Sequence, residues 1–334
     1  MIMKHIPKKW LHTLVNGLGC ATVVFSCGAA SSAPAQAYPV RPIRILLPYG
    51  PGGNSDIAAR LLGQKLSESM RQQIVIDNRP GAGGIIATEL AKKAEPDGYT
   101  LLWLNTGHAV SVSLYKSLPY DPVRDFMPVS TVGFATLALL VNAASPLNSV
   151  KALVASARAN PGKFNIGVTF VGSTNHVSAE LFKSMAGLDT QVVPFKTTPA
   201  LIGAVSSNDA QAIFEFIPPV LPLIKSRALR ALGVTSDRRD AGLPDVPTLA
   251  EAGLPGYEAS AWNGVAVPVK TPRVVIDRLN REINAAIAIP EMKQRLQDLG
   301  IDARGSTPQS FREVLVADIA KWQMVIEKAK IERR

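Results

Sequence analysis

Two glycine-rich segments in the first third of the sequence have the composition of anion-binding loops. They are Gly50-Pro51-Gly52-Gly53-Asn54-Ser55-Asp56 and Pro80-Gly81-Ala82-Gly83-Gly84. Each follows a short apolar run and precedes a segment with helical spacing. A helix N-terminus carries unsatisfied N–H groups and about half a positive charge, and glycine lets the backbone approach a ligand. Either loop alone could be a plain helix cap or tight turn, but the pair predicts a binding site.

The residues around these glycines indicate which anion they suit. No Lys-Ser or Lys-Thr pair follows them, so the first loop is not a P-loop, and the spacing is not the dinucleotide fingerprint. Neither loop contains Lys or Arg, which favours a small carboxylate over a polyphosphate. If the strands at 43–47 and 74–77 are neighbours, both loops lie at one carboxyl edge of a sheet and face the same ligand.

A third segment offers polar groups at another predicted helix start. Gly172-Ser173-Thr174-Asn175-His176 supplies hydroxyls, an amide, backbone N–H groups and an imidazole, as the second jaw of a cleft would. His176 could instead be held in place by the helix start, and His108 fits a structural role. The sequence has no G-x-S-x-G elbow, and the two distant histidines make a poor zinc pattern. We therefore predict no catalytic residues, no metal and no cofactor.

The rest of the chain alternates apolar runs with helical periodicity. Predicted strands cover 43–47, 74–76, 99–104, 137–141, 164–168, 191–195, 211–216, 229–235 and 261–267. Predicted helices cover 56–70, a segment ending near Lys93, 175–186, 199–205, 272–289 and 306–330. The last helix opens with a predicted capping box, Ser306-Thr307-Pro308-Gln309, and carries an apolar stripe in which Trp322 is a core residue. Two sets of βαβ units predict an α/β fold of two lobes with a cleft between them.

Composition and the N-terminal segment indicate an exported protein. The chain has 334 residues, is 47% hydrophobic and 19% charged, and carries a net charge of +10, without the basic-aromatic clusters of nucleic-acid binders. Lys4, Lys8 and Lys9 precede an apolar stretch and a small-residue site at Ala35-Gln36-Ala37, which is the order of a cleavable signal peptide. An uncleaved anchor and a lipoprotein at Cys27 are the alternatives. Both cysteines lie in this segment, so we expect no disulfide and a periplasmic protein.

Several motifs, in order, resemble the Bug-type receptors of tripartite tricarboxylate transporters. The resemblance covers residues 38 to about 330. It is carried by Leu47-Pro48-Tyr49-Gly50-Pro51-Gly52-Gly53-Asn54-Ser55-Asp56, Asp77-Asn78-Arg79-Pro80-Gly81-Ala82-Gly83-Gly84, Pro96-Asp97-Gly98-Tyr99-Thr100-Leu101-Leu102, Gly172-Ser173 with His176, Val193-Pro194-Phe195-Lys196, Pro244-Asp245-Val246-Pro247-Thr248 and Trp262-Asn263-Gly264.

The resemblance implies a type II periplasmic binding protein fold, with two βαβ lobes and a central cleft that closes on its ligand. It places a signal peptide at 1–37, the first lobe at 38–130 plus 261–334, and the second lobe at 131–260. Binding would use backbone groups and bridging waters. Carried over by motif, the ligand contacts are Tyr49, Gly53, Asn54, Ser55, Asp56, Ala82, Gly83, Asn105, Thr106, Thr169, Gly172, Ser173 and His176.

Three departures from the family pattern lie on the second lobe's side of the cleft. Phe195-Lys196-Thr197-Thr198 stands where Tyr-Lys-Gly-Gly is frequent, and Thr169-Phe170-Val171 replaces a small or glycine-rich turn. Glu215 stands where Asp is usual, so we add it to the expected ligand contacts. A carboxylate there could fill the pocket, favour a ligand with a hydrogen-bond donor, or lie at the surface.

The sequence therefore predicts a monomeric periplasmic receptor that captures a small carboxylate for membrane transporter subunits. One alternative is a ligand sensor that works with a two-component kinase. A secreted hydrolase that uses Ser173 and His176 is a further alternative. We expect no nucleic-acid partner.

Overall fold

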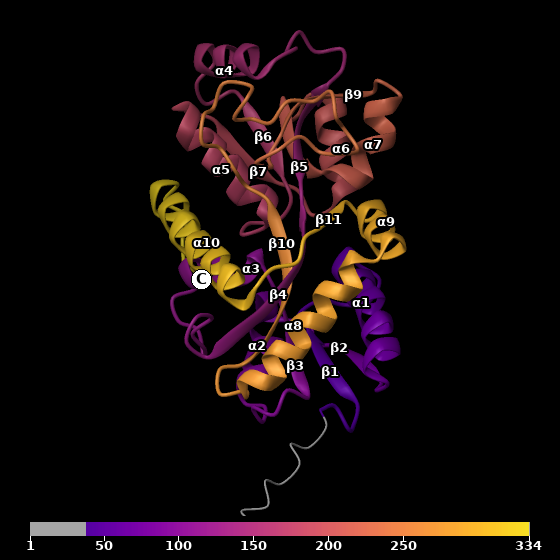
Figure 1. Cartoon of the computed structure of the whole chain (residues 1–334). Coiled ribbons are helices and arrows are strands. Elements are labelled where there is room, and N and C mark those ends of the chain that lie inside the picture. Colours follow the sequence, from indigo (N-terminus) through magenta and orange to yellow (C-terminus); the bar gives the residue numbers. More distant parts are fainter. Residues whose placement is uncertain (1–37, 334) are drawn as a thin grey trace, which may run out of the picture. The chain divides into compact units, whose positions relative to one another are not determined.

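Two mixed β-sheets flanked by helices organise residues 38–333, the part of the chain that this computed structural model describes (Figure 1). The predicted signal peptide, residues 1–37, lies outside the described residues. Within those residues, no helix is long and apolar enough to cross a membrane.

The six-stranded sheet has the order β11-β4-β10-β3-β1-β2. Its strands are β1 (Ile43–Leu47), β2 (Ile74–Asn78), β3 (Thr100–Asn105), β4 (Phe126–Ala135), β10 (Ala261–Pro268) and β11 (Ile301–Ala303). Strand β1 runs parallel to β2 and β3, whereas β10 is antiparallel to β3 and β4. The expected pairing of the first two strands is confirmed, so both glycine loops leave the sheet at the same carboxyl edge.

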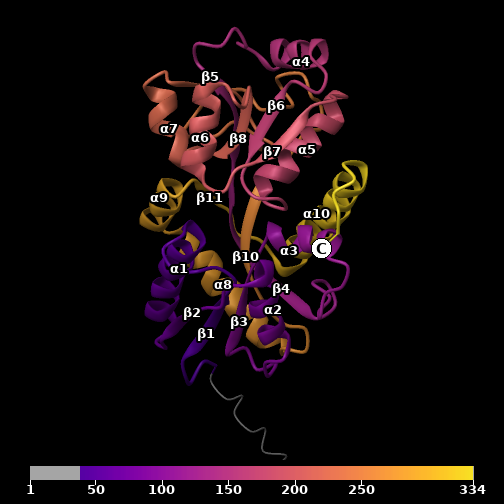
Figure 2. The ribbon, with the colours of Figure 1, turned by 180° about the vertical axis from the view of Figure 1, so that it is seen from behind.

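Helices cover both faces of this sheet because its side chains alternate. Ile43, Ile45 and Leu47 pack with α1 (Asn54–Met70), α8 (Arg273–Ala288) and α9 (Pro290–Asp298). Leu46 points to the opposite face, where α2 (Ile85–Lys92), α3 (Thr106–Leu114) and α10 (Pro308–Lys328) pack. The view from behind shows β1, β2 and β3 between these groups of helices (Figure 2).

The five-stranded sheet has the order β7-β6-β8-β5-β9. Its strands are β5 (Leu137–Asn142), β6 (Asn165–Val168), β7 (Gln191–Pro194), β8 (Ala212–Phe216) and β9 (Leu229–Val234). Its helices are α4 (Val150–Ala159), α5 (Thr174–Ala186), α6 (Thr198–Ser207) and α7 (Ile217–Lys225). Strand β6 is parallel to β7 and β8, and β5 is antiparallel to β8 and β9. The two sheets together confirm the predicted periplasmic binding protein fold.

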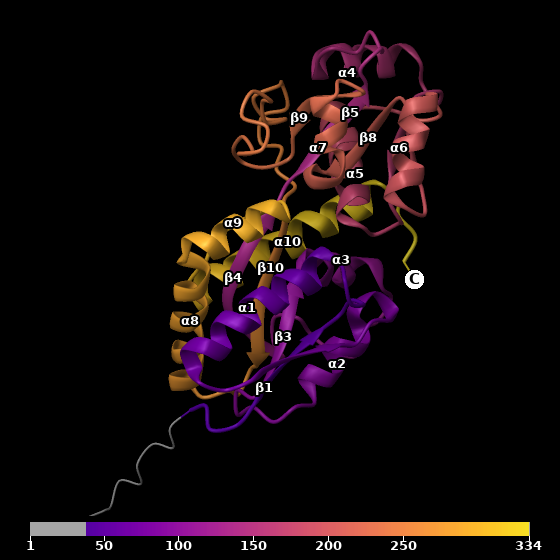
Figure 3. The ribbon, with the colours of Figure 1, turned by 90° about the vertical axis from the view of Figure 1, so that its right-hand side faces the viewer.

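The chain crosses between the sheets at Thr136, which separates β4 from β5, and returns as β10 begins at Ala261 (Figure 3). The predicted boundary at residue 130 lies inside β4, which stays in the six-stranded sheet through Ala135. Thr235 ties both crossings together: its hydroxyl accepts the N–H of Leu137 (3.0 Å) and its carbonyl accepts the N–H of Ala259 (2.9 Å). The division into two domains stays a prediction.

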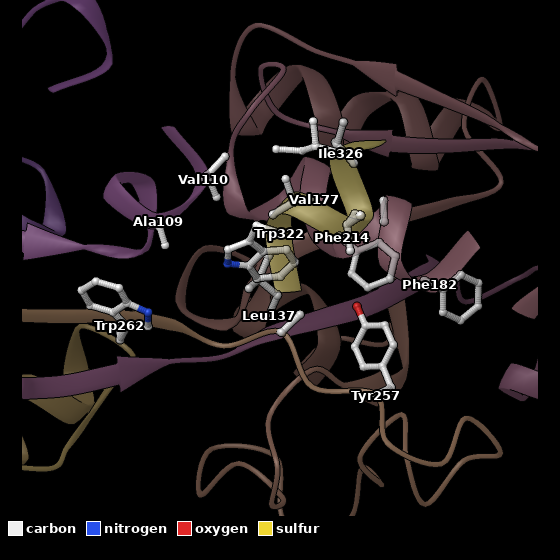
Figure 4. Packing of buried hydrophobic residues seen from close by; sticks show 14 of the residues in the cluster. Ala109, Val110, Leu137, Val177, Phe182, Phe214, Tyr257, Trp262, Trp322 and Ile326 are labelled. Carbon is white, nitrogen blue, oxygen red and sulfur yellow. The ribbon is translucent and has the colours of Figure 1, made fainter. Parts of the chain in front are cut away.

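Helix α10 packs against α3 and β4 of the first sheet and α5 of the second. Trp322, whose predicted burial is confirmed, lies among Leu137, Val177 and Phe214 from the second sheet's layers and Val110 from α3 (Figure 4). One hydrophobic cluster therefore extends across both halves of the described chain.

The predicted capping box at Ser306 is wrong, because α10 begins one residue later than the box requires. Thr307 is the N-cap, and its hydroxyl accepts the N–H of Ser310 at 3.0 Å. The Ser306 hydroxyl instead accepts the N–H of Thr131 in β4 at 3.0 Å, which anchors the start of the helix to the sheet.

Replacing Trp322 with Ala should lower the free energy of unfolding by about 3–5 kcal/mol, because it removes a fully buried aromatic side chain that no rearrangement can replace. Met324 on the same helix is 62% exposed, so Met324→Ala is the matched control and should change stability by less than about 0.5 kcal/mol. Urea unfolding of residues 38–334 measures both. Equal effects of the two substitutions would contradict the central position of Trp322.

Candidate functional site

A cavity of about 930 Å³ lies between loops from both sheets. The six-stranded sheet contributes the segments after β1, β2 and β3 and the start of β10, and the five-stranded sheet contributes those after β6 and β8. The predicted residues that line the cavity are Tyr49, Gly53, Asn54, Ser55, Gly83, Asn105, Thr106, Thr169, Gly172, Ser173 and Glu215. The structure thus brings together residues that lie up to about half the chain apart in the sequence.

The three remaining predicted ligand contacts are Asp56, His176 and Ala82. Asp56 and His176 are buried beside the cavity but do not line it. Ala82 begins the 3-10 turn η1 (Ala82–Gly84), and its side chain lies outside what the structure describes.

Asp56 fastens the first glycine loop from behind. Its carboxylate accepts the N–H of Gly52, the Nε–H of Arg60 and the Nδ2–H of Asn78, each at 2.9 Å. Burial raises the pKa of Asp56, but the hydrogen bonds from Arg60, Gly52 and Asn78 and the charge of Arg60 outweigh burial and lower the pKa to about 2. Asn78 also donates to the carbonyl of Tyr49 at 2.9 Å, so one ionised carboxylate fixes both ends of the loop.

Several helices begin at the cavity wall. Gly53 is the N-cap of α1 and has no side chain that could cap the first N–H groups of this helix. Asn105 caps α3 and Ser173 caps α5, each through a side-chain oxygen that accepts a backbone N–H (2.9 and 3.1 Å). Thr198 is the first residue of α6. These helix starts give the cavity a positive potential from backbone dipoles.

The second glycine loop is shaped by close packing. Gly83 has a φ of 65°, in the region that favours glycine, and a Cβ there would collide with the hydroxyl of Tyr115. The loop therefore brings bare backbone to the cavity wall beside Tyr115, at the end of α3.

His108 has a structural position rather than one in the cavity. Its Nδ1 accepts the N–H of Asn105 at 3.2 Å, and its Nε2 lies 2.9 Å from the hydroxyl of Thr88. Burial lowers the pKa of His108 to about 4, so the ring is neutral and its Nδ1 can accept this hydrogen bond from Asn105. The neutral ring completes the cap of α3 and holds Asn105, whose amide donates to the Tyr49 hydroxyl at 2.7 Å.

Ser173 and His176 organise the start of α5. The Ser173 hydroxyl accepts the N–H of His176 and a hydrogen bond from the Thr169 hydroxyl at 2.9 Å. The Nδ1 of His176 accepts the N–H of Gly172 at 3.3 Å. Both side chains therefore hold the loop in the shape that exposes Gly172 and Ser173 to the cavity.

Glu215, at the end of β8, is the acidic residue of the cavity wall. Its Oε1 accepts the N–H of Phe216 (2.7 Å) and the Nδ2–H of Asn175 (3.2 Å), and its Oε2 accepts the hydroxyl of Thr198 (2.9 Å). Burial raises the pKa of Glu215, and the hydrogen bonds from Phe216, Thr198 and Asn175 offset part of the shift. The surface alternative for Glu215 is wrong, because the side chain is only 2% exposed.

The charge of the cavity is unusual for an anion site. Among the described residues that line it, none is Lys, Arg or His, and Glu215 is the only Asp or Glu. No three His, Cys, Asp or Glu side chains between residues 38 and 333 are grouped like metal ligands. Recognition of a ligand there depends on backbone N–H groups, hydroxyls and amides.

Sequence reasoning missed one wall of the cavity. Gly107, Val110, Ser111 and Leu114 come from α3, which was not predicted, and Trp262 and Asn263 come from the start of β10. The motif Trp262-Asn263-Gly264 was a usable signal. The indole of Trp262 donates to Asp318 of α10 at 2.6 Å, and its backbone N–H donates to the Thr106 hydroxyl at 2.8 Å.

Comparisons with known proteins agree on one family. A family model described as the tripartite tricarboxylate transporter family receptor matches residues 58–331. Protein BugT of Bordetella pertussis is 36% identical over 91% of this chain and 94% of its own length. Rpa4515 of R. palustris, solved with adipate, is 34% identical with a TM-score of 0.75 and is covered over 100% of its chain and 89% of this one. MatC of Rhodopseudomonas palustris, solved with bound malate, is 28% identical with a TM-score of 0.69, over 86% of this chain and 100% of its own.

Replacing Asp56 with Asn should make stability less dependent on acid pH. The folded-state pKa of about 2 lies below the ordinary value of 3.8, so the carboxylate stabilises the fold above that value and the contribution is lost as pH falls toward 2. We expect Asp56→Asn to lower the free energy of unfolding by about 2 kcal/mol at pH 7, and to match the unsubstituted protein near pH 2.

Urea unfolding between pH 2 and 7 measures this difference. Asp245 is exposed, and Asp245→Asn is the control that should leave stability unchanged across the range. A destabilisation by Asp56→Asn that stays constant with pH would show that the ionised carboxylate is not what holds the loop.

Proposed function

Because this chain belongs to the tripartite tricarboxylate transporter receptor family, we propose that it captures a small carboxylate in the cavity between its two sheets and delivers it to membrane transporter subunits. The family is one of transporter receptors, and two similar solved structures are described as a periplasmic transporter and the periplasmic binding protein BugD. Two relatives have been solved with the carboxylates adipate and malate, which supports the same ligand class here.

One observation carries the proposal: helix starts and glycine loops converge on a cavity whose lining includes no basic side chain. A carboxylate has a single charge on two oxygens, which a few backbone N–H groups and hydroxyls can satisfy. A polyphosphate would leave several negative charges without a cationic partner. The cavity therefore suits one carboxylate end of a small molecule.

We propose direct or water-bridged contacts to the cavity-lining residues of the predicted set. On the first sheet's side, the loops around Gly53 and Gly83 and the start of α3 would hold the anion. On the other side, Thr169, Gly172 and Ser173 would close the contact. Asp56 and His176 would act by positioning these loops, since neither lines the cavity.

Family membership supports a proposal on location and partners. We propose that residues 1–37 are a signal peptide removed during export to the periplasm, and that transporter subunits are the partner of the mature, monomeric chain. The alternative partner, a sensor kinase, stays a prediction, and so does the expected absence of catalysis. Genes for transporter subunits beside this gene would favour the transporter.

The proposal predicts thermal stabilisation of residues 38–334 by a carboxylate. A specific acid at 100 times its Kd should raise the melting temperature by roughly 5–10 °C, because binding to the folded state alone shifts unfolding. A library of mono-, di- and tricarboxylates, with the matching neutral amides, tests this on protein refolded to remove any host ligand. Equal shifts for an acid and its amide, or none for any acid, would contradict carboxylate binding.

Gly53→Leu should abolish that shift without lowering the stability of the ligand-free protein. Gly53 has a φ of −80°, which any residue adopts, and a Cβ added there meets no atom within 4 Å, so the new side chain occupies the cavity wall without strain. Gly203 in α6 is likewise exposed and open, and it lies outside the cavity. Gly203→Leu is therefore the matched control that should retain binding. Binding by Gly53→Leu at full affinity would place the carboxylate elsewhere.

A further inference from the structure

Glu215 is a negative group at a site that otherwise attracts anions. It lines the cavity, is 2% exposed, and is the only Asp or Glu among the described lining residues. Among residues 38–333, no Lys or Arg forms an ion pair with it, and its hydrogen-bond partners there are a backbone N–H, an amide and a hydroxyl. A buried carboxylate with no cation partner is costly to keep, so its position calls for a functional explanation.

The hydrogen bonds of Glu215 leave acceptor capacity on one oxygen. A carboxylate oxygen has two lone-pair positions. Oε1 accepts from both Phe216 and Asn175, whereas Thr198 is the only donor to Oε2 in the part of the chain that the structure describes. Thr198 is also part of the cavity wall, so the less occupied oxygen is the one that neighbours a lining hydroxyl.

The surroundings hold this carboxylate in a fixed place. Glu215 is the residue before the last of β8, in register with Ala138 of β5. Asn175 lies in the first turn of α5 and also donates to the Phe214 carbonyl at 2.9 Å. Thr198 begins α6 directly after its capping residue Thr197. Three elements of the five-stranded sheet's side therefore fix the carboxylate, and it cannot swing away from a ligand without losing hydrogen bonds to all of them.

We propose that Glu215 is the specificity-determining residue of this receptor, selecting acids that carry a hydrogen-bond donor, an amino or hydroxyl group, and rejecting acids whose second group is another carboxylate. The inference rests on the proposed function and names the ligand class within it. The helix starts on the six-stranded sheet's side bind the ligand carboxylate. The donor then fills the remaining position on Oε2.

The energetics support a strong preference. A hydrogen bond to a charged group contributes about 1.5–3 kcal/mol, which corresponds to roughly 10- to 100-fold in affinity. A ligand carboxylate at the same place gains no such bond. It also brings a second negative charge beside a buried one, which disfavours both ionised forms.

Matched acids of equal chain length test the selection. Adipate, 6-aminohexanoate, 6-hydroxyhexanoate and hexanoate differ only at the far end of a six-carbon chain, and the corresponding four- and five-carbon sets cover shorter spans. Isothermal titration at pH 8 gives their affinities for residues 38–334. We expect the best amino or hydroxy acid to bind at least about tenfold more tightly than the dicarboxylate of the same length.

Glu215→Gln should reverse the preference. Glutamine keeps the shape but replaces one carboxylate oxygen by an N–H donor and removes the charge, so the dicarboxylate should gain and the amino acid should lose, each by about tenfold. Glu215→Asp keeps the charge and should retain the order of preference. Glu180 of α5 is also a buried glutamate but lies outside the cavity, so Glu180→Gln is the control that should leave the order unchanged.

The outcomes separate this inference from the proposed function. Tight binding of a dicarboxylate by the unsubstituted protein, or an unchanged order in Glu215→Gln, overturns the role of Glu215 while carboxylate capture stands. Failure of every acid in every set to bind overturns both. If the melting temperature shows that Glu215→Gln does not fold, the order of ligand preference in Glu215→Asp and in Thr198→Val decides the question. Thr198→Val removes the hydrogen bond to Oε2, so this oxygen is more available and the preference for a donor should become stronger. A weaker preference in Thr198→Val contradicts the inference.

Discussion

The ionised carboxylate of Asp56 is the interaction on which the candidate site depends. It accepts hydrogen bonds from the loop after β1, from its own helix α1 and from Asn78 at the end of β2. Without it, the Gly50–Gly53 segment would have no side-chain anchor to set its distance from the second glycine loop. Glycine gives such a loop freedom to approach a ligand, and that freedom costs entropy on folding. Asp56 supplies the restraint that the glycines lack.

A site that binds anions through backbone groups gains strength but little selectivity. Helix starts attract any small anion, and a backbone N–H group is the same donor whichever residue carries it. Selectivity must then come from the few side chains that can differ without disturbing the loops. In this cavity, Thr198, Phe170 and Glu215 are side chains of this kind, and all three lie on the five-stranded sheet's side.

The sequence predicted the elements whose pattern is local and missed those that tertiary contacts impose. Strand β1 and helix α5 appear within a residue of the expected bounds because apolar runs and caps mark them. Helix α3 was not predicted because Asn105 and His108, which cap it in a buried hydrogen-bond network, have the composition of a polar loop in the sequence. Helix α7 tolerates Pro218 and Pro219 in its first turn, but Pro222 lies inside it and argues against a helix. Most predicted site residues line the cavity, because the glycine motifs mark the loops that form it. Asp56 does not line the cavity. Its orientation was not predicted because a sequence does not show which way a carboxylate in the first turn of a helix points.

Helix α10 adds a constraint on how the two sides can move. It packs on α3 and on α5, the two helices whose starts line opposite walls of the cavity, and Trp322 fills the space among them. It also accepts the indole N–H of Trp262 through Asp318, at the point where the chain returns from the second sheet. Any closure that brought α5 toward α3 must preserve or repack this buried cluster, because protein interiors are close-packed and resist sliding. The buried cluster therefore restrains how far the starts of α3 and α5 can move relative to each other.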